Sequence, residues 1–493
     1  MAALSPSSRS SRFRLHWFDD LGMAEDLRKS LYWVIFGVTA GMFGNVVTTG
    51  STWSGFQRIV LGANDFQLGL IAAIPVALNV AQLFISYYME RKRNRRFLFL
   101  FFGIVGRFFW IPIALVPYLF PSFSVDRRIW LVIVFVAFVA IGNSFVNLGF
   151  GSLMGDLVPM RIRGQYFGVR QRVMLAAAVI CGVIVAAMID TLGEIGYTIA
   201  LVLAGVTTIM DIVCFLFFKW PDMAEPEGGV DRTPIRVMLK EVLVNKPFMK
   251  VVLFFTLWQF AVGISSPFFN VFMLEELNMS FIQMTLYTQI ASNIVTVLTV
   301  SRWGRLIDRY GNKTIMQLVI LVNCLSPLPW LLATPKAIWY VLLSNVVSGC
   351  FWPVMDLAQQ NLYLNQSPRM HRSMYVAVFF SCINLAGIAL GNAVGGWLMQ
   401  NAFKQLEALH FTLFGVEWIN THYIILLGSV LRLLVALLIL PRINEQDAWS
   451  VRDAARDIQR EQLSAYHRHR FARRAYFLRR KARREQQDDP REE

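Results

Sequence analysis

The chain has 493 residues, of which 56% are hydrophobic, 14% aromatic and only 16% charged. Soluble domains are about a quarter charged, so this composition excludes an ordinary soluble fold and indicates an all-α protein that crosses a membrane many times. The net charge of +15 does not indicate nucleic acid, because the cations lie in short loops and in a basic tail, as is typical of membrane proteins.

The N-terminal segment, residues 1–29, is polar and contains five cations. It lacks a short apolar core followed by a small-residue cleavage site, so we expect no removable signal peptide. The 5 cysteines of the chain all fall in apolar stretches without metal-type spacing. We therefore expect them to be packing residues rather than disulfides or metal ligands.

Twelve segments are long enough to cross the hydrocarbon, which takes ~20 mostly apolar residues. We expect a six-helix bundle in residues 30–218 and another in 248–441, joined by a cytoplasmic linker at 219–247 that is rich in Pro, Gly and charge. The expected spans are 30–50, 66–88, 97–119, 129–154, 170–190, 196–218, 248–272, 281–302, 314–333, 337–364, 373–401 and 422–441.

The distribution of Lys and Arg predicts the orientation. With the N-terminus inside, forty of the 47 cations fall in inside segments and five in outside loops, while Arg107 and Arg432 lie within spans. Because positive residues are retained on the cytoplasmic side, we expect a multi-pass protein of the cell (inner or plasma) membrane with both termini in the cytoplasm.

Two pairs of inside loops correspond between the halves. "GRLIDRYGNK" after the eighth span aligns with "SYYMERKRNRR" after the second, which places Asp308 opposite Glu90. "PRMHRSMYVA" after the tenth span aligns with "PMRIRGQYFG" after the fourth, which places Tyr375 opposite Tyr166. Several transporter folds contain structural repeats, so these matches indicate an internal duplication.

The loop "GRLIDRYGNK" has a Gly, three residues, Asp-Arg, one residue, a second Gly and then a basic position. It resembles the signature loop of the major facilitator superfamily, and the similarity of the chain to that family extends over roughly residues 30 to 441. The resemblance implies twelve helices in two pseudo-symmetric bundles, with spans 1, 4, 7 and 10 lining a central cavity. It also implies a transporter rather than an enzyme, with no cofactor, catalytic residue or metal site.

The signature loop predicts a cytoplasmic gate. Gly311 permits a tight turn with positive φ. Asp308 can accept a hydrogen bond from the N-terminus of the following helix or place negative charge near it. The arginines are expected to pair with acids or carbonyls at neighbouring helix ends, although topology signalling and solvated turn charges explain the cations equally well. The gate candidates are Glu90, Arg91, Arg163, Gly304, Asp308, Arg309, Gly311, Lys313 and Arg372.

Polar residues recur at helical spacing on spans 1, 4, 7 and 10. Polar side chains facing lipid are costly, so these should face protein or water; the alternative is that they hold helices together. A lining of amides, hydroxyls and aromatic rings favours a polar solute such as a sugar or glycoside. The cavity candidates are Asn45, Thr48, Thr52, Asn143, Asn147, Trp258, Gln259, Ser266, Asn270, Asn345, Trp352, Asp356 and Gln359.

Four charged residues, Arg107, Asp211, Asp356 and Arg432, lie within spans, where charges are rare and usually functional or paired. Asp356 is on the polar stripe of span 10 and is expected to bind substrate or carry a coupling proton, unless it forms a fixed pair with an arginine. Arg107 and Asp211 are expected to form a structural pair; if Arg107 faced the cavity, an anionic substrate would be favoured.

The tail, residues 442–493, has aromatic residues and a leucine among many arginines. Such a segment is attracted to anionic headgroups by about 1 kcal/mol per well-placed cation, or else remains a solvated basic tail. We expect lipid, a small-molecule substrate and protons as partners, no nucleic acid, and a monomer.

These features predict a secondary active transporter that moves a small polar solute by alternating access, as a proton symporter. The main alternative is an exporter of drugs, lipids or organic anions. The fifth span, "MLAAAVICGVIVAAMID", lacks the proline of the Gly-Pro signature that such exporters often carry. A transporter-like sensor or scaffold that binds its ligand without moving it is a further alternative.

Overall fold

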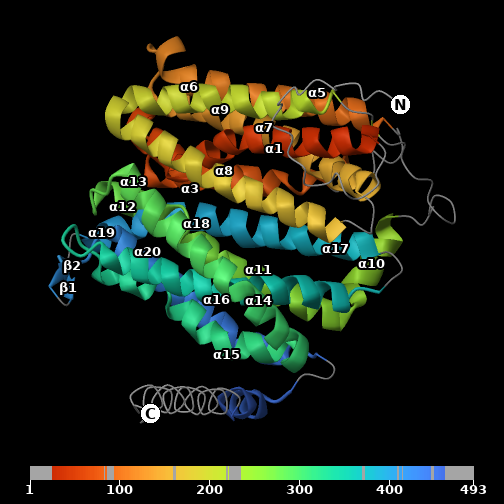
Figure 1. Ribbon diagram of the computed structural model, residues 1–493. Helices are drawn as coiled ribbons and strands as arrows, with labels where there is room; N and C mark the ends of the chain where they lie inside the picture. Colours follow the sequence, from red (N-terminus) through yellow and green to blue (C-terminus); the bar gives the residue numbers. More distant parts are fainter. Residues whose placement is uncertain are drawn as a thin grey trace, which may run out of the picture. The chain divides into compact units, whose positions relative to one another are not determined.

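A computed structural model describes residues 25–82, 84–85, 94–158, 163–217, 220, 235–368, 372–407, 410–413, 415–445 and 449–460. These residues are almost entirely helical, and the single hairpin among them pairs β1 (Thr412–Leu413) with β2 (Val416–Glu417) (Figure 1). The chain divides into two compact units, which are described separately. The first consists of residues 1–62 and 81–231, and the second of residues 63–80 and 232–493.

Ten helices in the described part of the chain are long and apolar enough to cross a membrane. This confirms an all-α, multi-pass membrane protein. The described parts of the other two expected spans are helical but differ from the rest. Asp65–Leu78 is short, and Phe281–Tyr310 has polar residues on several successive turns, so the number twelve itself stays a prediction.

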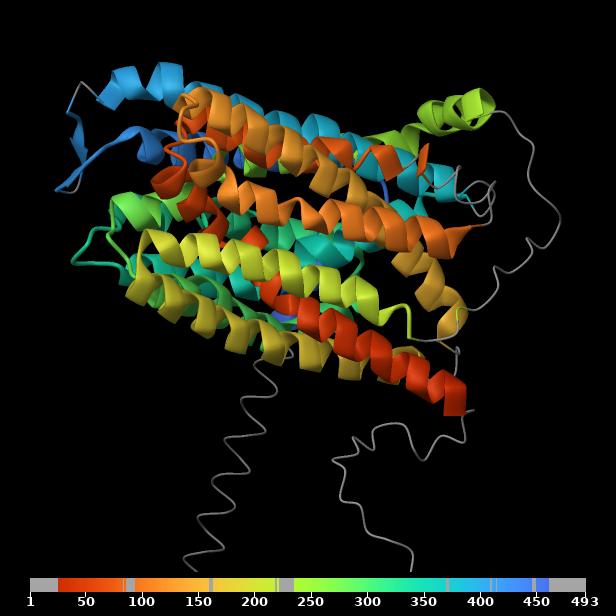
Figure 2. The same cartoon turned by 90° about the horizontal axis from the view of Figure 1, so that it is seen from above.

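The first unit is organised around the contact between α1 and α9, which lie side by side in Figures 1 and 2. Gly37, Gly41 and Gly44 lie on the face of α1 that meets α9, and a Cβ added at Gly41 would be 3.0 Å from the Cβ of Asp211. Small residues let membrane helices approach this closely. The elements are α1 (Glu25–Thr49), α2 (Ser51–Gly55), η2 (Phe56–Val60), α5 (Arg95–Phe108), α6 (Trp110–Leu119), α7 (Val125–Leu157), α8 (Arg163–Leu192) and α9 (Glu194–Cys214).

The second unit is organised around α11, which packs on α18, η6 and α20. Gly391 and Gly395 allow α18 to reach the backbone of α11, since a Cβ at Gly391 would lie 2.6 Å from the Phe260 carbonyl oxygen. The elements are α3 (Asp65–Leu78), α10 (Ile235–Val244), α11 (Lys246–Ser265), α12 (Phe268–Glu275), α13 (Phe281–Met284), η4 (Thr285–Ile290), α14 (Ala291–Tyr310), α15 (Asn312–Leu325), η5 (Leu328–Leu332), α16 (Trp339–Asn365), α17 (Arg372–Cys382), η6 (Ile383–Ala389), α18 (Leu390–Leu398), η7 (Met399–Phe403), α19 (Lys404–Glu407), α20 (Asn420–Leu438) and η8 (Leu440–Arg442). A further helix covers 451–460.

Helix α3 belongs to the second unit, although the sequence pattern assigns it to the first bundle. It begins with a capping box between Asn64 and Gln67 and packs on α18. Glycines face each other at this contact, because a Cβ at Gly69 would lie 2.9 Å from the Cα of Gly396. The bundle boundaries expected from the sequence, 30–218 and 248–441, stay a prediction.

The tyrosines matched by the internal repeat each make a hydrogen bond to a neighbouring helix end, but the two bonds differ in kind. The Tyr166 hydroxyl, at the start of α8, donates to the Leu31 carbonyl on α1 at 3.3 Å. The Tyr375 hydroxyl, at the start of α17, accepts from the Asn245 side chain at the start of α11, at 3.5 Å. Tyr166 thus joins the start of α8 to the N-terminal part of α1, and Tyr375 joins the start of α17 to the start of α11. Burial raises the pKa of the Tyr166 hydroxyl, which keeps it protonated.

Candidate functional site

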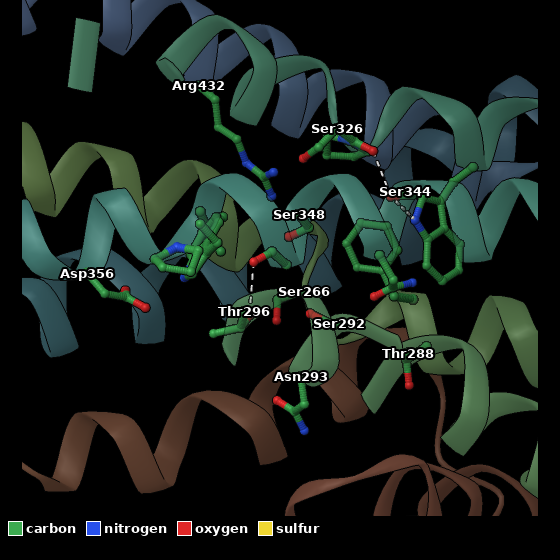
Figure 3. A pocket seen from close by; sticks show the side chains of 18 of the residues that line it. Ser266, Thr288, Ser292, Asn293, Thr296, Ser326, Ser344, Ser348, Asp356 and Arg432 are labelled. Carbon is green, nitrogen blue, oxygen red and sulfur yellow. Dashed lines mark hydrogen bonds between the residues drawn. The ribbon is translucent and has the colours of Figure 1, made fainter. Parts of the chain in front are cut away.

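A cavity of about 660 Å³ lies within the second unit, between α11, α12, α14, α16 and α20. Ligand-binding pockets typically measure roughly 300–1,000 Å³, so this cavity has room for a small solute. Figure 3 shows the hydroxyl and amide side chains around this cavity, together with the charged side chains of Asp356 and Arg432.

Helix α16 forms one wall of the cavity through Asn345, Ser348, Trp352 and Asp356. Pro353 lies inside this helix and has no N–H to donate to the carbonyl four residues earlier, that of Gly349. The Thr296 hydroxyl from α14 donates to this carbonyl instead, at 2.9 Å. Proline thus creates an acceptor at the cavity wall, and a hydroxyl of the facing helix satisfies it.

A second wall, next to α16, is the polar helix Phe281–Tyr310. Thr288, Ser292 and Thr296 recur every fourth residue and line the cavity with Asn293. Thr288 falls in the π-helical turn η4, a kind of turn that is frequent at functional sites. The sequence prediction left this wall out because it assigned the cavity to spans 1, 4, 7 and 10. The hydroxyl residues that recur at every fourth position of span 8 are the signal that could have found it.

The structure brings five of the expected cavity residues of the second unit to this cavity: Ser266, Asn270, Asn345, Trp352 and Asp356. Trp258, Gln259 and Gln359 are not among the residues that line it. Trp258 is a core residue, 1% exposed, whose ring stacks on Phe254.

Gln259 lies on the side of α11 that packs on η6, where a Cβ at Gly387 would meet its Cβ at 3.2 Å. Helical spacing alone did not distinguish this packed side of α11 from the side that faces the cavity.

The remaining candidates belong to the first unit. Asn45 and Asn147 are exposed, and Asn143 is half-buried. The Thr48 hydroxyl donates to the Gly44 carbonyl at 2.8 Å, while Thr52 is buried. A cavity role for these five residues stays a prediction.

The expected pair of Arg107 and Asp211 is present in the first unit. The Arg107 Nη2 donates to the Asp211 Oδ2 at 3.0 Å, and each side chain is 12% exposed. Arg432 and Asp356 both line the cavity of the second unit, yet among the residues that the structure describes no ion pair joins them. A fixed pair between Asp356 and an arginine is therefore not observed there.

The signature loop, residues 303–313, turns at Gly311, whose φ of 94° confirms the expected positive value. The N-terminus of α15 after this turn is capped by Glu445, and Asp308 accepts no hydrogen bond from it within the described residues. The Glu445 carboxylate accepts from the backbone N–H of Asn312 at 3.1 Å and of Lys313 at 2.6 Å. The exposed Asp308 has no hydrogen bond or ion pair within the described ranges.

Two of the three cations of the loop contact the end of the last span or the segment that follows it. Arg309 pairs with Asp457 at 2.7 Å, and the Lys313 Nζ donates to the Pro441 carbonyl at 3.0 Å. The Tyr310 hydroxyl also donates to Asp457, at 2.9 Å. In Figure 1 this segment ends in the short blue helix 451–460, below α15.

The other gate candidates are only partly described. Gly304 lies inside α14 with open space where a Cβ would be. Glu90 and Arg91 fall outside the described residues. Arg163 and Arg372 begin α8 and α17, but their side chains are outside the described part.

The family comparison decides the identity of the fold. The family model described as Major Facilitator Superfamily matches residues 31–363 and 291–482. The chain belongs to the major facilitator superfamily. No curated protein sequence matches it.

Solved structures of this superfamily share the fold. A bacterial homologue of the human lysosomal transporter Spinster, in an inward-facing and unoccupied conformation, is 16% identical; the match covers 87% of this chain and 100% of that one, with a TM-score of 0.63. The nucleoside transporter NupG is 13% identical, with coverages of 86% and 100% and a TM-score of 0.64. A D-xylose–proton symporter is 12% identical, with coverages of 87% and 99% and a TM-score of 0.61. At such low identity these matches establish the fold only.

Proposed function

We propose that this superfamily member is a secondary active transporter that moves a small polar solute by alternating access, coupled to protons in symport. The observation that carries the proposal is the hydroxyl- and amide-lined cavity of the second unit, with one carboxylate, Asp356, on its wall. The family and the similar transporter structures support transport rather than enzymatic chemistry.

The lining favours a solute with several hydroxyl groups, such as a sugar or glycoside. Ser266 at the end of α11, Ser292 on α14 and Ser348 on α16 offer hydroxyls to the cavity. A hydroxyl both donates and accepts hydrogen bonds. Trp330 and Trp352 provide flat apolar surfaces beside them. Mixed apolar and polar linings of this kind orient small ligands.

Asp356 is the proposed coupling residue. It is exposed on the cavity wall, where a carboxylate without an ion pair among the described residues is able to take up and release a proton. Ionisable residues within spans often belong to proton relays in transporters. The D-xylose–proton symporter of the same fold shows that one such protein couples to protons.

Flux measurements test the transport function. The full-length protein in proteoliposomes is expected to take up at least one member of a panel of sugars, organic anions and cationic dyes, faster with an inward proton gradient than without it. Uptake of cationic dyes alone would favour the exporter alternative. Ligand binding without gradient-dependent flux of any panel member would overturn transport in favour of the sensor or scaffold.

Asp356→Asn tests the coupling role. The variant is expected to exchange solute across the membrane but to lose accumulation driven by the proton gradient, because an amide cannot be ionised. Glu407→Gln, which removes a carboxylate from α19, a helix that does not line the cavity, is the control and should accumulate solute normally. Normal accumulation by Asp356→Asn would rule out the role.

The orientation completes the proposal. An excess of cations in the expected inner loops and tail supports cytoplasmic termini in the cell membrane. The basic tail, which lies mostly outside the described residues, would then face anionic headgroups. The transporter is proposed to act as a monomer.

A further inference from the structure

Arg432 is the most unusual residue of the cavity. It lies in the middle of α20, is 4% exposed, and lines the cavity from the side opposite α14. Figure 3 shows its guanidinium group pointing from α20 into the cavity, toward Ser348 on α16. A permanently charged group is thus directed into a space of about 660 Å³.

The guanidinium has no partner within the part of the chain that the structure describes. No ion pair or hydrogen bond to Arg432 is found there, and its Nε is buried without an acceptor. Arg107, in a span of the first unit, is by contrast paired with Asp211 at 3.0 Å. An unpaired buried charge is destabilising, and a charge within a membrane span is a functional candidate by default.

The hydroxyls around the cavity complement an anion that also has hydroxyl groups. Thr288, Thr296 and Ser326 donate their hydrogens to the carbonyls of Met284, Gly349 and Asn323. Their oxygens therefore present lone pairs to the cavity, which suit the hydroxyl donors of a solute. Arg432 supplies the opposite property, a group that only donates and suits an anionic oxygen.

We propose that Arg432 is the anion-binding residue of the cavity, and that the solute is a small polyhydroxylated anion whose carboxylate or phosphate group binds its guanidinium. The proposal rests on the transport function proposed above, since it names the class of solute. The planar guanidinium makes two parallel hydrogen bonds to a carboxylate or phosphate, which no other described side chain of this cavity can do.

Binding by matched solutes tests the inference. Purified full-length protein in detergent is titrated, at constant ionic strength, with glucose, glucuronate and glucose 6-phosphate, and the shift of its Tm is followed. We expect at least one of the two anions to bind at least tenfold more tightly than glucose. Which anion it is distinguishes a sugar acid from a sugar phosphate.

Substitutions connect the binding to Arg432. Arg432→Gln should weaken binding of the preferred anion at least tenfold, while Arg432→Lys should retain part of it because the charge is kept. Lys336→Gln removes one cation from an exposed loop of the same unit and should bind as the wild type does. Because no described partner is lost, Arg432→Gln should unfold at the same Tm as the wild type or higher in the absence of solute. If it does not fold, Arg432→Lys and Arg432→Met replace it.

The outcomes separate this inference from the transport function. Equal binding of glucose and of both anions, or unchanged anion binding in Arg432→Gln, overturns the anion site. Flux of a neutral sugar that Arg432→Gln leaves unchanged also overturns it, but leaves transport intact. Anion binding that depends on Arg432, in a protein that moves no solute in proteoliposomes, supports the site and overturns transport.

Discussion

Arg107 and Arg432 look alike in the sequence, since each is a single arginine within an apolar span. The structure gives them different surroundings: Arg107 meets Asp211, 104 residues further along the chain, and Arg432 faces the cavity. The sequence could predict the first pair because only two charges fall in the spans concerned. It could not predict that Arg432 faces the cavity, because nothing near this residue in the sequence shows which way its side chain points.

The Arg107–Asp211 pair predicts that removing one of its two charges lowers the stability of the protein strongly. Asp211→Asn leaves a buried guanidinium without its charged partner, and breaking such a pair typically costs about 3–5 kcal/mol. Thermal unfolding in detergent should show a clearly lower Tm.

Glu25→Gln is the control for this pair, because it removes the exposed partner of Lys29 at 2.8 Å and should leave the Tm unchanged. Replacing both Arg107 and Asp211 by apolar residues should recover much of the loss. Equal Tm values for Asp211→Asn and wild type would show that the pair does not stabilise the fold.

At the scale of elements, the segment after α20 binds the signature loop through Glu445 and Asp457, and we call this pair of contacts the clamp. Glu445 caps α15, and Asp457 accepts from both Arg309 and Tyr310. The loop pattern correctly predicted the turn at Gly311, because positive φ is a local property. It did not identify Glu445 as the capping residue, because this carboxylate comes from a distant part of the chain.

Substitution of Glu445 tests the clamp. Glu445→Gln weakens the capping of α15, and losing a helix cap costs about 0.5–2 kcal/mol. Backbone amides at the start of α15 should exchange with deuterium faster, and residues 449–460 should become more sensitive to protease.

Asp308→Asn is the matched control, since Asp308 has no partner among the described residues. Its loss should leave deuterium exchange of the backbone amides at the start of α15 unchanged. Faster exchange in Asp308→Asn than in Glu445→Gln would reverse the assignment of the two acids.

At the scale of the whole molecule, the sequence predicted the class of protein and most of the spans. Apolar length and the placement of cations are properties that every span shows by itself. The division into compact units depends instead on contacts between distant parts of the chain. Helix α3, for example, packs through Gly69 onto Gly396, more than three hundred residues away. Such a close contact between backbones leaves no periodic pattern in either helix.

Gly69→Ala tests the α3 contact. Its Cβ would lie 2.5 Å from the Asn392 carbonyl oxygen, and overpacking of this kind typically costs about 1–3 kcal/mol. The Tm should fall.

Gly151→Ala is the control for this contact, because a Cβ there meets open space and alanine favours a helix by about 1 kcal/mol over glycine. A Tm for Gly69→Ala at or above that of Gly151→Ala would show that α3 does not pack tightly on α18.

The clamp on the signature loop also bears on the order in which the protein is completed during synthesis. The ribosome makes Asn312 133 residues before Glu445, so α15 enters the membrane before its capping carboxylate exists. The loop reaches its final hydrogen-bond pattern only after the last span is inserted and the following segment folds back. Until then, the two backbone N–H groups that Glu445 will bind must donate their hydrogen bonds to water or to another acceptor near the nascent chain.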